Sequence, residues 1–309
     1  MDHAGLIFDH SIHYIDHLAP FCALANWPLI VCEEQIAQLV RQYYPGVEVI
    51  ESSIWDVKLP TYTLSCDNGP LLKAAFPNQN TKLIWLPHGN SDKGWNGPFF
   101  DALSSEDIAL VYGQKMIDFM QRKNVFPKTI PIGNFRWHYY CKHRSFYEQH
   151  SLLPKKGQNF LYAPTWDDSE GNCSFWKAFP RLVETVPGNL IVKLHPNTLL
   201  KFDVEIEVLK GRFEKKNVFF LSDYPPIYPL LIHCDAYIGD MSSIGYDFLK
   251  FDKPMYFLNA SPVFPLHQCG QSLETYEFLP QKHLASIRKK TYDATFASDI
   301  DWTELTSTL

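Results

Sequence analysis

This sequence of 309 residues lacks the features that mark several classes of protein. It has no apolar run long enough to cross a bilayer as a helix, and its N-terminus has no basic segment ahead of an apolar core. Its 28 basic and 34 acidic residues give a formal charge of -6, which excludes the strongly basic surface of a general nucleic-acid binder. We therefore expect a cytoplasmic protein without a signal peptide, a membrane span or a nucleic-acid partner.

Cysteine and histidine are present, but not in the spacings typical of disulfide frameworks or metal sites. The seven cysteines are scattered, and no C-x-x-C pair occurs. Such spacing favours reduced thiols in a cytoplasmic protein. His13 and His17 have the spacing of one helical face, and His10 lies close by, but no Cys or H-E-x-x-H context accompanies them. We predict no metal site in this group.

The chain does contain a regular alternation of short apolar strands and amphipathic helices, which predicts α/β structure with two doubly wound parallel sheets. The first set has predicted strands at residues 6–9, 28–32, 46–50, 63–66, 81–86, 108–112 and 129–132, with helices near 14–24, 33–43 and 71–75. The second set has predicted strands at residues 159–162, 189–194, 218–221, 236–239 and 254–258, with helices at 175–186 and 226–233. The tail from residue 271 has no clear period.

The length of the chain suits two domains of ordinary size. We predict a first domain at residues 1–134 and a second at residues 135–309, with residues 135–150 as a connecting helix. This connecting segment is rich in aromatic and basic residues. Its composition fits either a membrane interface or a helix that packs its aromatic side chains inward.

The most informative stretch is residues 235–258, where a buried strand, a sharp turn and a helix follow one another. We expect the helix to begin with Asp240 or Ser242 as its N-cap. The Ser242 and Ser243 hydroxyls would then lie beside free backbone N–H groups at the positive end of a helix dipole, which is a cradle for a phosphate. A plain capped helix in a βαβ unit explains the same residues equally well.

Polar residues also follow other predicted strands at their carboxyl ends, where parallel sheets bind ligands. They include His88, Thr165 and His195. If the two sheets face each other, these residues share one cleft with the turn at residues 240–243. Each has a structural alternative, since His88 can cap a turn with Gly89 and His195 can form a turn before a proline.

Four segments, taken in order, resemble the CDP-glycerol glycerophosphotransferase family, which primes and polymerises glycerol-phosphate teichoic acids. They are LPHGNSDK at 86–93, LYAPTW at 161–166, VKLHP at 192–196 and GDMSS at 239–243, and GNFR at 133–136 is a weaker fifth match. The resemblance implies a GT-B architecture of two Rossmann-like domains with a cleft between them. It also implies transfer of glycerol phosphate, or a related polyol phosphate, from a CDP-linked donor to a hydroxyl of a lipid-linked or cell-surface glycan acceptor. The resemblance further implies that CMP is released and that no metal takes part. We expect no cofactor and a cytoplasmic enzyme, and the aromatic and basic connecting segment raises the hypothesis of peripheral contact with the inner face of the membrane.

The same resemblance implies roles for individual residues. His88 matches the family's general base on the acceptor hydroxyl, and His195 matches the histidine that contacts the donor pyrophosphate. The remaining predicted donor-binding residues are Thr165, Lys193, Asp240, Ser242, Ser243 and Arg136, of which Lys193 alternates with His195 along its strand. For acceptor binding we predict His10 and His13, because the first βα loop should line the cleft, and Lys93, which can neutralise a phosphate.

The chain departs from the family pattern after the Thr-Trp pair. The family usually has an arginine there, whereas this chain has Asp167, and a carboxylate would repel a pyrophosphate. This difference leaves open a GT-B glycosyltransferase that uses a nucleotide-sugar donor. A non-catalytic binding protein that kept the fold is a third hypothesis, and the presence of both His88 and His195 argues against it.

Overall fold

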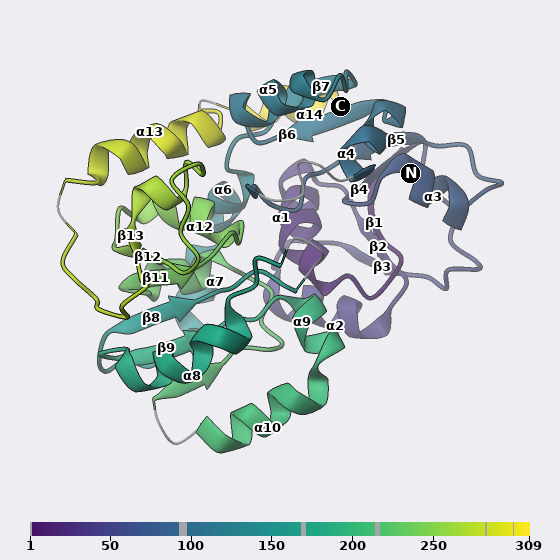
Figure 1. Ribbon diagram of the computed structural model, residues 1–309. Helices are drawn as coiled ribbons and strands as arrows, with labels where there is room; N and C mark the ends of the chain where they lie inside the picture. Colours follow the sequence, from purple (N-terminus) through teal and green to yellow (C-terminus); the bar gives the residue numbers. More distant parts are fainter. Residues whose placement is uncertain (1, 93–97, 168–170, 214–216, 282, 299) are drawn as a thin grey trace. The chain divides into compact units, whose positions relative to one another are not determined.

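The structure is a computed structural model that describes residues 2–92, 98–167, 171–213, 217–281, 283–298 and 300–309. The chain divides into two compact units, each built on one parallel sheet (Figure 1). Unit 1 comprises residues 1–88, 95–149 and 293–309, and unit 2 comprises residues 89–94 and 150–292. The prediction of two doubly wound parallel sheets is confirmed.

The unit 1 sheet has seven strands in the order β3-β2-β1-β4-β5-β6-β7. The strands are β1 (His3–Ile7), β2 (Leu29–Val31), β3 (Val49–Glu51), β4 (Tyr62–Ser65), β5 (Lys82–Trp85), β6 (Ile108–Val111) and β7 (Lys128–Pro131). All paired neighbours are parallel, and Gly5 of β1 lies opposite Leu29 of β2 and Leu64 of β4. The chain order reverses between β1 and β4, which is the place where ligands bind to open parallel sheets, outside the carboxyl ends of the strands.

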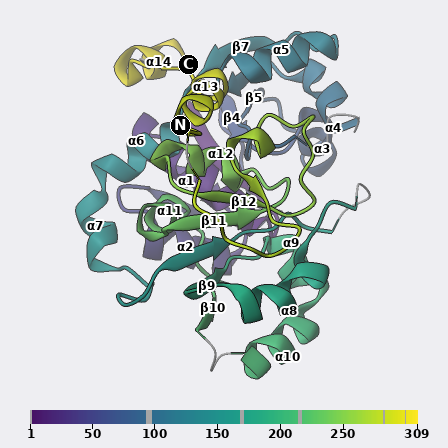
Figure 2. The ribbon, with the colours of Figure 1, turned by 60° about the vertical axis from the view of Figure 1, so that its left-hand side comes forward.

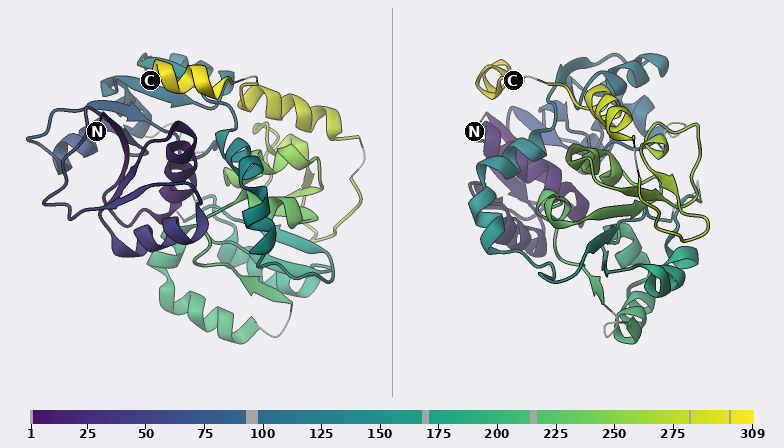
Figure 3. Two further views of the ribbon diagram at one scale, coloured as in Figure 1. Left: turned by 180° about the vertical axis from the view of Figure 1, so that it is seen from behind. Right: turned by 90° about the vertical axis from the view of Figure 1, so that its left-hand side faces the viewer.

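The helices of unit 1 are η1 (Ile12–Tyr14), α1 (Ile15–Ala25), α2 (Glu34–Tyr43), α3 (Gly69–Ala75), α4 (Pro98–Asp101), η2 (Ala102–Ser105), α5 (Gln114–Arg122), α6 (Phe135–Lys142), α7 (Arg144–Gln149) and α14 (Trp302–Thr308). Helix α1 is buried along almost its whole length, as expected for a helix without a polar face. Helix α14, yellow in Figure 3, packs on it through an edge-on contact between Trp302 and Phe21, with ring centroids 5.8 Å apart.

We predicted a domain boundary between residues 134 and 135, whereas the structure groups residues 135–149 with unit 1. Side-chain hydrogen bonds explain this grouping. The hydroxyl of Tyr139 donates to the carbonyl of Pro45 at 2.8 Å, and that of Tyr147 donates to the carbonyl of Tyr43 at 2.7 Å. The segment forms two helices, α6 and α7, because the chain leaves helical geometry at His143. Its buried aromatic residues pack inward, as one of the two predictions required.

The unit 2 sheet has six strands in the order β10-β9-β8-β11-β12-β13. They are β8 (Asn159–Tyr162), β9 (Asn189–Val192), β10 (Val218–Phe220), β11 (Ala236–Gly239), β12 (Met255–Phe257) and β13 (Gln271–Ser272). The chain order reverses between β8 and β11, whose strands are buried throughout. The carboxyl ends of these two strands therefore mark the ligand-binding position of unit 2.

The helices of unit 2 are α8 (Phe175–Thr185), α9 (Pro196–Lys201), α10 (Asp203–Phe213), α11 (Tyr228–His233), α12 (Ile244–Phe248), η3 (Leu249–Phe251) and η4 (His267–Cys269). The chain passes from unit 2 to unit 1 within α13 (Ala285–Thr295). Helix α8 covers one face of β8 and β9 through an apolar cluster that includes Phe175, Leu182 and Val192 (Figure 2). None of the helices in the described ranges has the length and apolar character needed to cross a membrane.

Candidate functional site

The carboxyl edge of the unit 1 sheet carries His88, which follows β5. The ring of His88 contacts His13 and Tyr14, with centroids 5.7 and 5.1 Å away. Burial, and secondarily the neighbouring His13, lower the pKa of His88 to about 3. The imidazole is therefore neutral at pH 7, and a neutral imidazole has one ring nitrogen that can accept a proton.

The residues predicted to bind the acceptor have different environments. His13 lies in η1 against His88, and burial lowers its pKa to about 4, so it is also neutral at pH 7. His10 is exposed, with its Nδ1 3.5 Å from a carboxylate oxygen of Glu33. Lys93 lies outside the described residues. The structure thus brings His13, but not His10, into contact with His88, and their acceptor roles stay predictions.

A second ionisable residue at this edge, Asp67, was not predicted. It follows β4, directly beside the point where the strand order reverses, and Tyr14 donates a hydrogen bond to its Oδ1 at 3.1 Å. Burial, and secondarily the charge of Asp9, raise the pKa of Asp67 to about 6, although the hydrogen bond from Tyr14 opposes this shift. Asp67 follows a predicted strand as His88 does, so the strand-end rule applied to His88 would have identified it.

In unit 2, Asp240 organises the carboxyl ends of β8 and β11. Its carboxylate is fully buried, and Oδ1 accepts a hydrogen bond from the N–H of Thr165 at 2.8 Å. Oδ2 accepts hydrogen bonds from the N–H and hydroxyl of Ser174, at 2.9 and 2.7 Å. These three bonds give Asp240 a positioning role for the loop after β8. The predicted contact of Asp240 and Thr165 with the donor stays a prediction.

The turn after Asp240 leads into α12, which begins one residue later than we predicted. Ser243, rather than Asp240 or Ser242, is the N-cap, and its side chain makes no capping hydrogen bond. Ser242 is buried and Ser243 is half-buried. Because α12 is only five residues long, its dipole contributes less to anion binding than a long helix would, and the hydroxyls and backbone N–H groups of the turn become the main candidates.

Residues 89–92 belong to unit 2 and make hydrogen bonds to this turn and to α12, which follows it. The hydroxyl of Ser91 donates to the carbonyl of Met241 at 3.1 Å. The hydroxyl of Tyr246 lies 2.7 Å from both carboxylate oxygens of Asp92. Both Asp92 and Tyr246 are buried. The segment therefore has a defined position on the turn that carries Ser242 and Ser243.

His195 follows β9 and is the N-cap of α9. Its Nδ1 accepts a hydrogen bond from the N–H of Asn197 at 3.1 Å. A neutral imidazole that accepts at Nδ1 carries its proton on Nε2, so His195 presents an N–H donor rather than a basic nitrogen. The indole of Trp166 stacks beside it, with ring centroids 6.1 Å apart. Lys193, two residues earlier, donates from Nζ to the carbonyl of Tyr224 at 2.6 Å.

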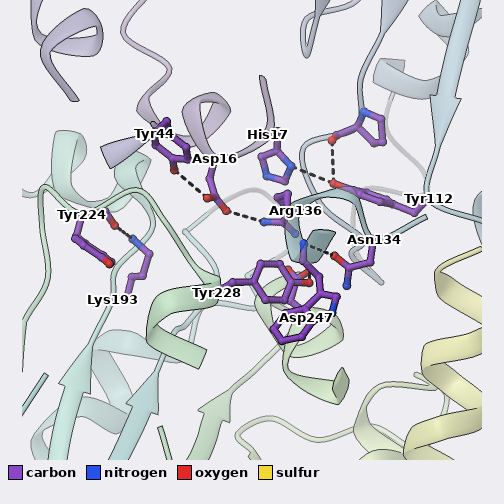
Figure 4. Close-up of polar contacts among 12 residues, drawn as sticks. Asp16, His17, Tyr44, Tyr112, Asn134, Arg136, Lys193, Tyr224, Tyr228 and Asp247 are labelled. Atoms are coloured by element: carbon purple, nitrogen blue, oxygen red, sulfur yellow. Dashed lines mark hydrogen bonds and ion pairs between the residues drawn. The ribbon is translucent and has the colours of Figure 1, made fainter. Parts of the chain in front are cut away.

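Arg136 lies in α6 and forms a buried ion pair within unit 1 (Figure 4). Its NH1 is 2.9 Å from Oδ2 of Asp16, and the side chain is 5 % exposed. The hydroxyl of Tyr44 donates to the other oxygen of Asp16 at 2.8 Å. These contacts give Arg136 a structural role in joining α6 to α1, and its donor-binding role stays a prediction.

Within the described ranges, no three His, Cys, Asp or Glu side chains converge as ligands for a metal ion. Of the three histidines considered as a metal group, His17 bonds to Tyr112 and His10 faces Glu33.

Comparison with known proteins shows that part of the chain is similar to one family. Residues 135–261 match the model of the CDP-Glycerol:Poly(glycerophosphate) glycerophosphotransferase family. The predicted resemblance is confirmed over this segment. It contains His195 and the turn at residues 240–243, whereas His88 lies outside it.

One curated protein is similar to part of the chain. The chain is 25% identical to the teichoic acid ribitol-phosphate polymerase TarL of Staphylococcus aureus over 214 residues, which is 62% of this chain and 36% of the relative. The match thus spans only about a third of the length of that curated relative.

Solved structures show the fold. The wall teichoic acid polymerase TagF, as a variant soaked with CDPG, superimposes with a TM-score of 0.65 at 12% identity, over 99% of this chain and 87% of that one. The UDP-GlcNAc 2-epimerase from Neisseria meningitidis, bound to UDP-GlcNAc, gives a TM-score of 0.52 at 12% identity, over 95% of this chain and 91% of that one. The predicted GT-B-like class, with two Rossmann-like sheets, is confirmed.

The departure from the glycerophosphotransferase family at Asp167 has a local explanation. Nζ of Lys201, at the end of α9, is 3.1 Å from Oδ2 of Asp167. Both side chains are exposed, so the pair contributes little to stability. Its effect is electrostatic, because Lys201 offsets the negative charge that we expected to repel a pyrophosphate.

Proposed function

We propose that this chain transfers glycerol phosphate, or a related polyol phosphate, from a CDP-linked donor to a hydroxyl of a lipid-linked or cell-surface glycan acceptor. The acceptor oxygen forms a bond to the phosphorus that carries the polyol, the bond from that phosphorus to the CMP oxygen breaks, and the hydroxyl proton passes to a base. The family match over residues 135–261 supports the donor class. TagF, which shares the fold, was soaked with CDPG as a variant.

The main observation in support of the proposal is the tautomer of His195, which has its proton on Nε2. Phosphoryl transfer needs positioning and stabilisation of charge more than covalent help, and an N–H donor meets this need where the leaving group becomes negative. The hydrogen bond from Asn197 to Nδ1 holds the His195 proton on Nε2. In this proposal Nε2 donates to a pyrophosphate oxygen, with Ser242, Ser243, Thr165 and Lys193 as further donor ligands.

His88 is the proposed base. Its imidazole is neutral, as a proton acceptor must be. A general base works best with a pKa near the working pH, and the pKa of about 3 in the protein without substrate is too low for this. A substrate phosphate bound beside the ring would raise it, because a nearby anion favours the protonated imidazole.

The test is CMP release from CDP-glycerol and CDP-ribitol, with a lipid-linked glycan as acceptor. We expect release with one of these donors, and a loss of about 10²–10⁴-fold in the variant His88→Ala. Activity that survives EDTA is expected, because the proposed mechanism uses no metal or other cofactor. Absence of CMP with both donors, in a preparation whose folding is verified by circular dichroism, would overturn the proposal.

A nucleotide-sugar glycosyltransferase is the alternative, favoured by Asp167 in place of the family's arginine. The two functions need different nucleotides. A thermal-shift comparison of CDP, UDP and GDP separates them, since a glycerophosphotransferase should be stabilised most by CDP. Stabilisation by UDP or GDP alone would favour the sugar donor.

Peripheral contact with a membrane is the remaining part of the proposal. The exposed face of α6 and α7 carries Lys142 and Arg144, which can approach anionic lipids, whereas Tyr139, Tyr140 and Tyr147 are buried. Sedimentation with anionic vesicles, comparing the wild type with Lys142→Gln/Arg144→Gln, tests this contact. Equal sedimentation of the two proteins would count against it.

A further inference from the structure

A buried hydrogen-bonded chain in unit 1 ends at the peptide that precedes His88. The hydroxyl of Tyr112, at the end of β6, lies 2.9 Å from the carbonyl oxygen of Pro87 and 3.0 Å from Nδ1 of His17. Tyr112 is 1 % exposed and His17 is 6 % exposed. Figure 4 shows the Tyr112 hydroxyl and the His17 ring pointing toward one another.

The direction of each hydrogen bond follows from the partners. A carbonyl oxygen can only accept, so the single hydroxyl proton of Tyr112 is directed to Pro87. The hydroxyl oxygen then accepts from His17, whose proton must be on Nδ1. Burial, and then the charge of Arg136, lower the pKa of His17 well below its usual value, so the ring is neutral and this tautomer is the one present.

The Pro87 carbonyl is important because it is linked to the one backbone dihedral that can still vary just before His88. The proline ring restricts its own φ to a narrow range. The dihedral ψ of Pro87 is therefore the main variable that sets the direction of the peptide leading into His88, and the position of the carbonyl oxygen reports this ψ. A hydrogen bond to that oxygen holds ψ at one value.

We propose that Tyr112 is a positioning residue for His88. Its hydroxyl, which accepts a hydrogen bond from His17, donates to the Pro87 carbonyl and fixes the orientation of that peptide. The orientation of the peptide in turn sets the direction of the His88 side chain. Neither Tyr112 nor His17 needs to touch substrate for this role. The inference rests on the proposed function in one respect only, namely that His88 is the base.

The variant Tyr112→Phe removes the hydroxyl and keeps the ring, which stacks on Phe135 with centroids 6.0 Å apart. We expect kcat to fall about 10–100-fold, because a displacement of about 1 Å in a reacting group costs about that much. The KM for the donor should stay within about twofold, since the proposed donor ligands lie in unit 2.

Tyr139→Phe is the matched control. Tyr139 is also a buried tyrosine of unit 1 whose hydroxyl donates to a proline carbonyl, here that of Pro45 at 2.8 Å. It loses the same kind of hydrogen bond without touching the peptide before His88. We expect Tyr139→Phe to retain kcat within about twofold.

A double-mutant cycle distinguishes positioning from a general structural role. If Tyr112 acts through His88, Tyr112→Phe lowers CMP release about 10–100-fold in the wild type but less than about twofold in His88→Ala. An equal fold-loss in both backgrounds would show a structural role only and would overturn the inference.

A second measurement does not depend on turnover. In protein labelled with ¹⁵N histidine, the ring resonances of His88 are assigned by their loss in His88→Ala. They should shift in Tyr112→Phe and stay in place in Tyr139→Phe, and unchanged His88 resonances in Tyr112→Phe would overturn the inference. If the wild type releases no CMP from any donor, the proposed function fails, while the resonances still decide whether Tyr112 positions His88.

Discussion

Gly89 lies directly against Ser243. A Cβ atom built on Gly89 would be 2.6 Å from Oγ and 2.8 Å from Cβ of Ser243, and the backbone of Gly89 has a φ of +132°. Side chains other than that of glycine avoid this conformation. The close approach, together with the bonds of Ser91 and Asp92, holds residues 89–92 on the turn after β11.

We predict that Gly89→Ala lowers the free energy of unfolding by about 1–3 kcal/mol, because the methyl group meets Ser243 and the backbone conformation becomes strained. Urea titration followed by circular dichroism measures this change. Gly211→Ala is the control, since nothing lies within 4 Å of its Cβ position in α10, and alanine there should stabilise by up to about 1 kcal/mol. Equal stability of Gly89→Ala and wild type would contradict the observed approach.

The three hydrogen bonds of Asp240 lead to a second prediction. Asp240→Asn replaces one acceptor oxygen by an NH₂ group, which must face an N–H of Thr165 or Ser174. We expect a loss of about 2–4 kcal/mol in unfolding free energy, because buried donors lose a charged acceptor. The exposed Asp203, which bonds to the N–H of Val204, is the control, since Asn accepts that bond equally well. A small effect of Asp240→Asn would show that the loop after β8 is held by other contacts.

The variant His195→Asn distinguishes the roles of the two ring nitrogens of His195. The asparagine oxygen can replace Nδ1 as the acceptor for Asn197, but nothing replaces the Nε2–H donor. We predict nearly unchanged thermal stability together with a loss of CDP affinity of about tenfold, the scale of one hydrogen bond to a charged group. Isothermal titration with CDP measures the affinity. Wild-type affinity in a folded His195→Asn protein would remove His195 from the donor site.

The buried pair of Asp16 and Arg136 predicts an effect on stability. Arg136→Met leaves the Asp16 carboxylate without its cation, and removing one partner of a buried pair typically costs about 3–5 kcal/mol. Urea titration should show a correspondingly lower midpoint. The exposed pair of Arg144 and Glu148 in α7 serves for comparison, and Arg144→Met should leave the midpoint unchanged. Similar midpoints for the two variants would mean that Arg136 is not held by Asp16 in solution.

The lowered pKa of His88 predicts how stability depends on pH. The folded protein holds His88 with a pKa of about 3, whereas the ordinary value is 6.5, so between these values the unfolded chain binds more protons. Stability therefore rises with pH in this window and falls as the pH decreases below 6.5. Between pH 7 and pH 5 the contribution of His88 falls by about 2 kcal/mol.

Urea titration at pH 7 and pH 5 measures how much stability a protein loses over this interval. We expect His88→Asn to lose about 2 kcal/mol less than the wild type. His10→Asn is the control, because the exposed ring of His10 is in contact with solvent before and after unfolding. A pH dependence of His88→Asn equal to that of the wild type would show that the pKa of His88 is not lowered in the folded protein.

The strand-end positions of the candidate residues could be predicted from the sequence. Residues 159–162 and 236–239 form strands at the predicted bounds, because short apolar runs bounded by turn residues are typical of buried strands. His88 and His195 therefore follow strands as predicted. Helices α4, η2, α5, α9 and α10 and the elements of the tail were not predicted. Helix α10 has its few buried residues in a mostly polar sequence, so periodicity indicates it only weakly.

The sequence by itself determined which residues follow a strand, because apolar runs, turn residues and prolines act within a few positions of the chain. The four motifs could also be found in the sequence, because each is a contiguous run of residues. The tertiary structure alone decided that Arg136 pairs with Asp16, that Asp240 holds the loop after β8, and that Tyr112 reaches the carbonyl before His88. Such contacts join residues distant in sequence, and their hydrogen bonds and pKa shifts depend on burial, which exists only once the sheets and helices have packed.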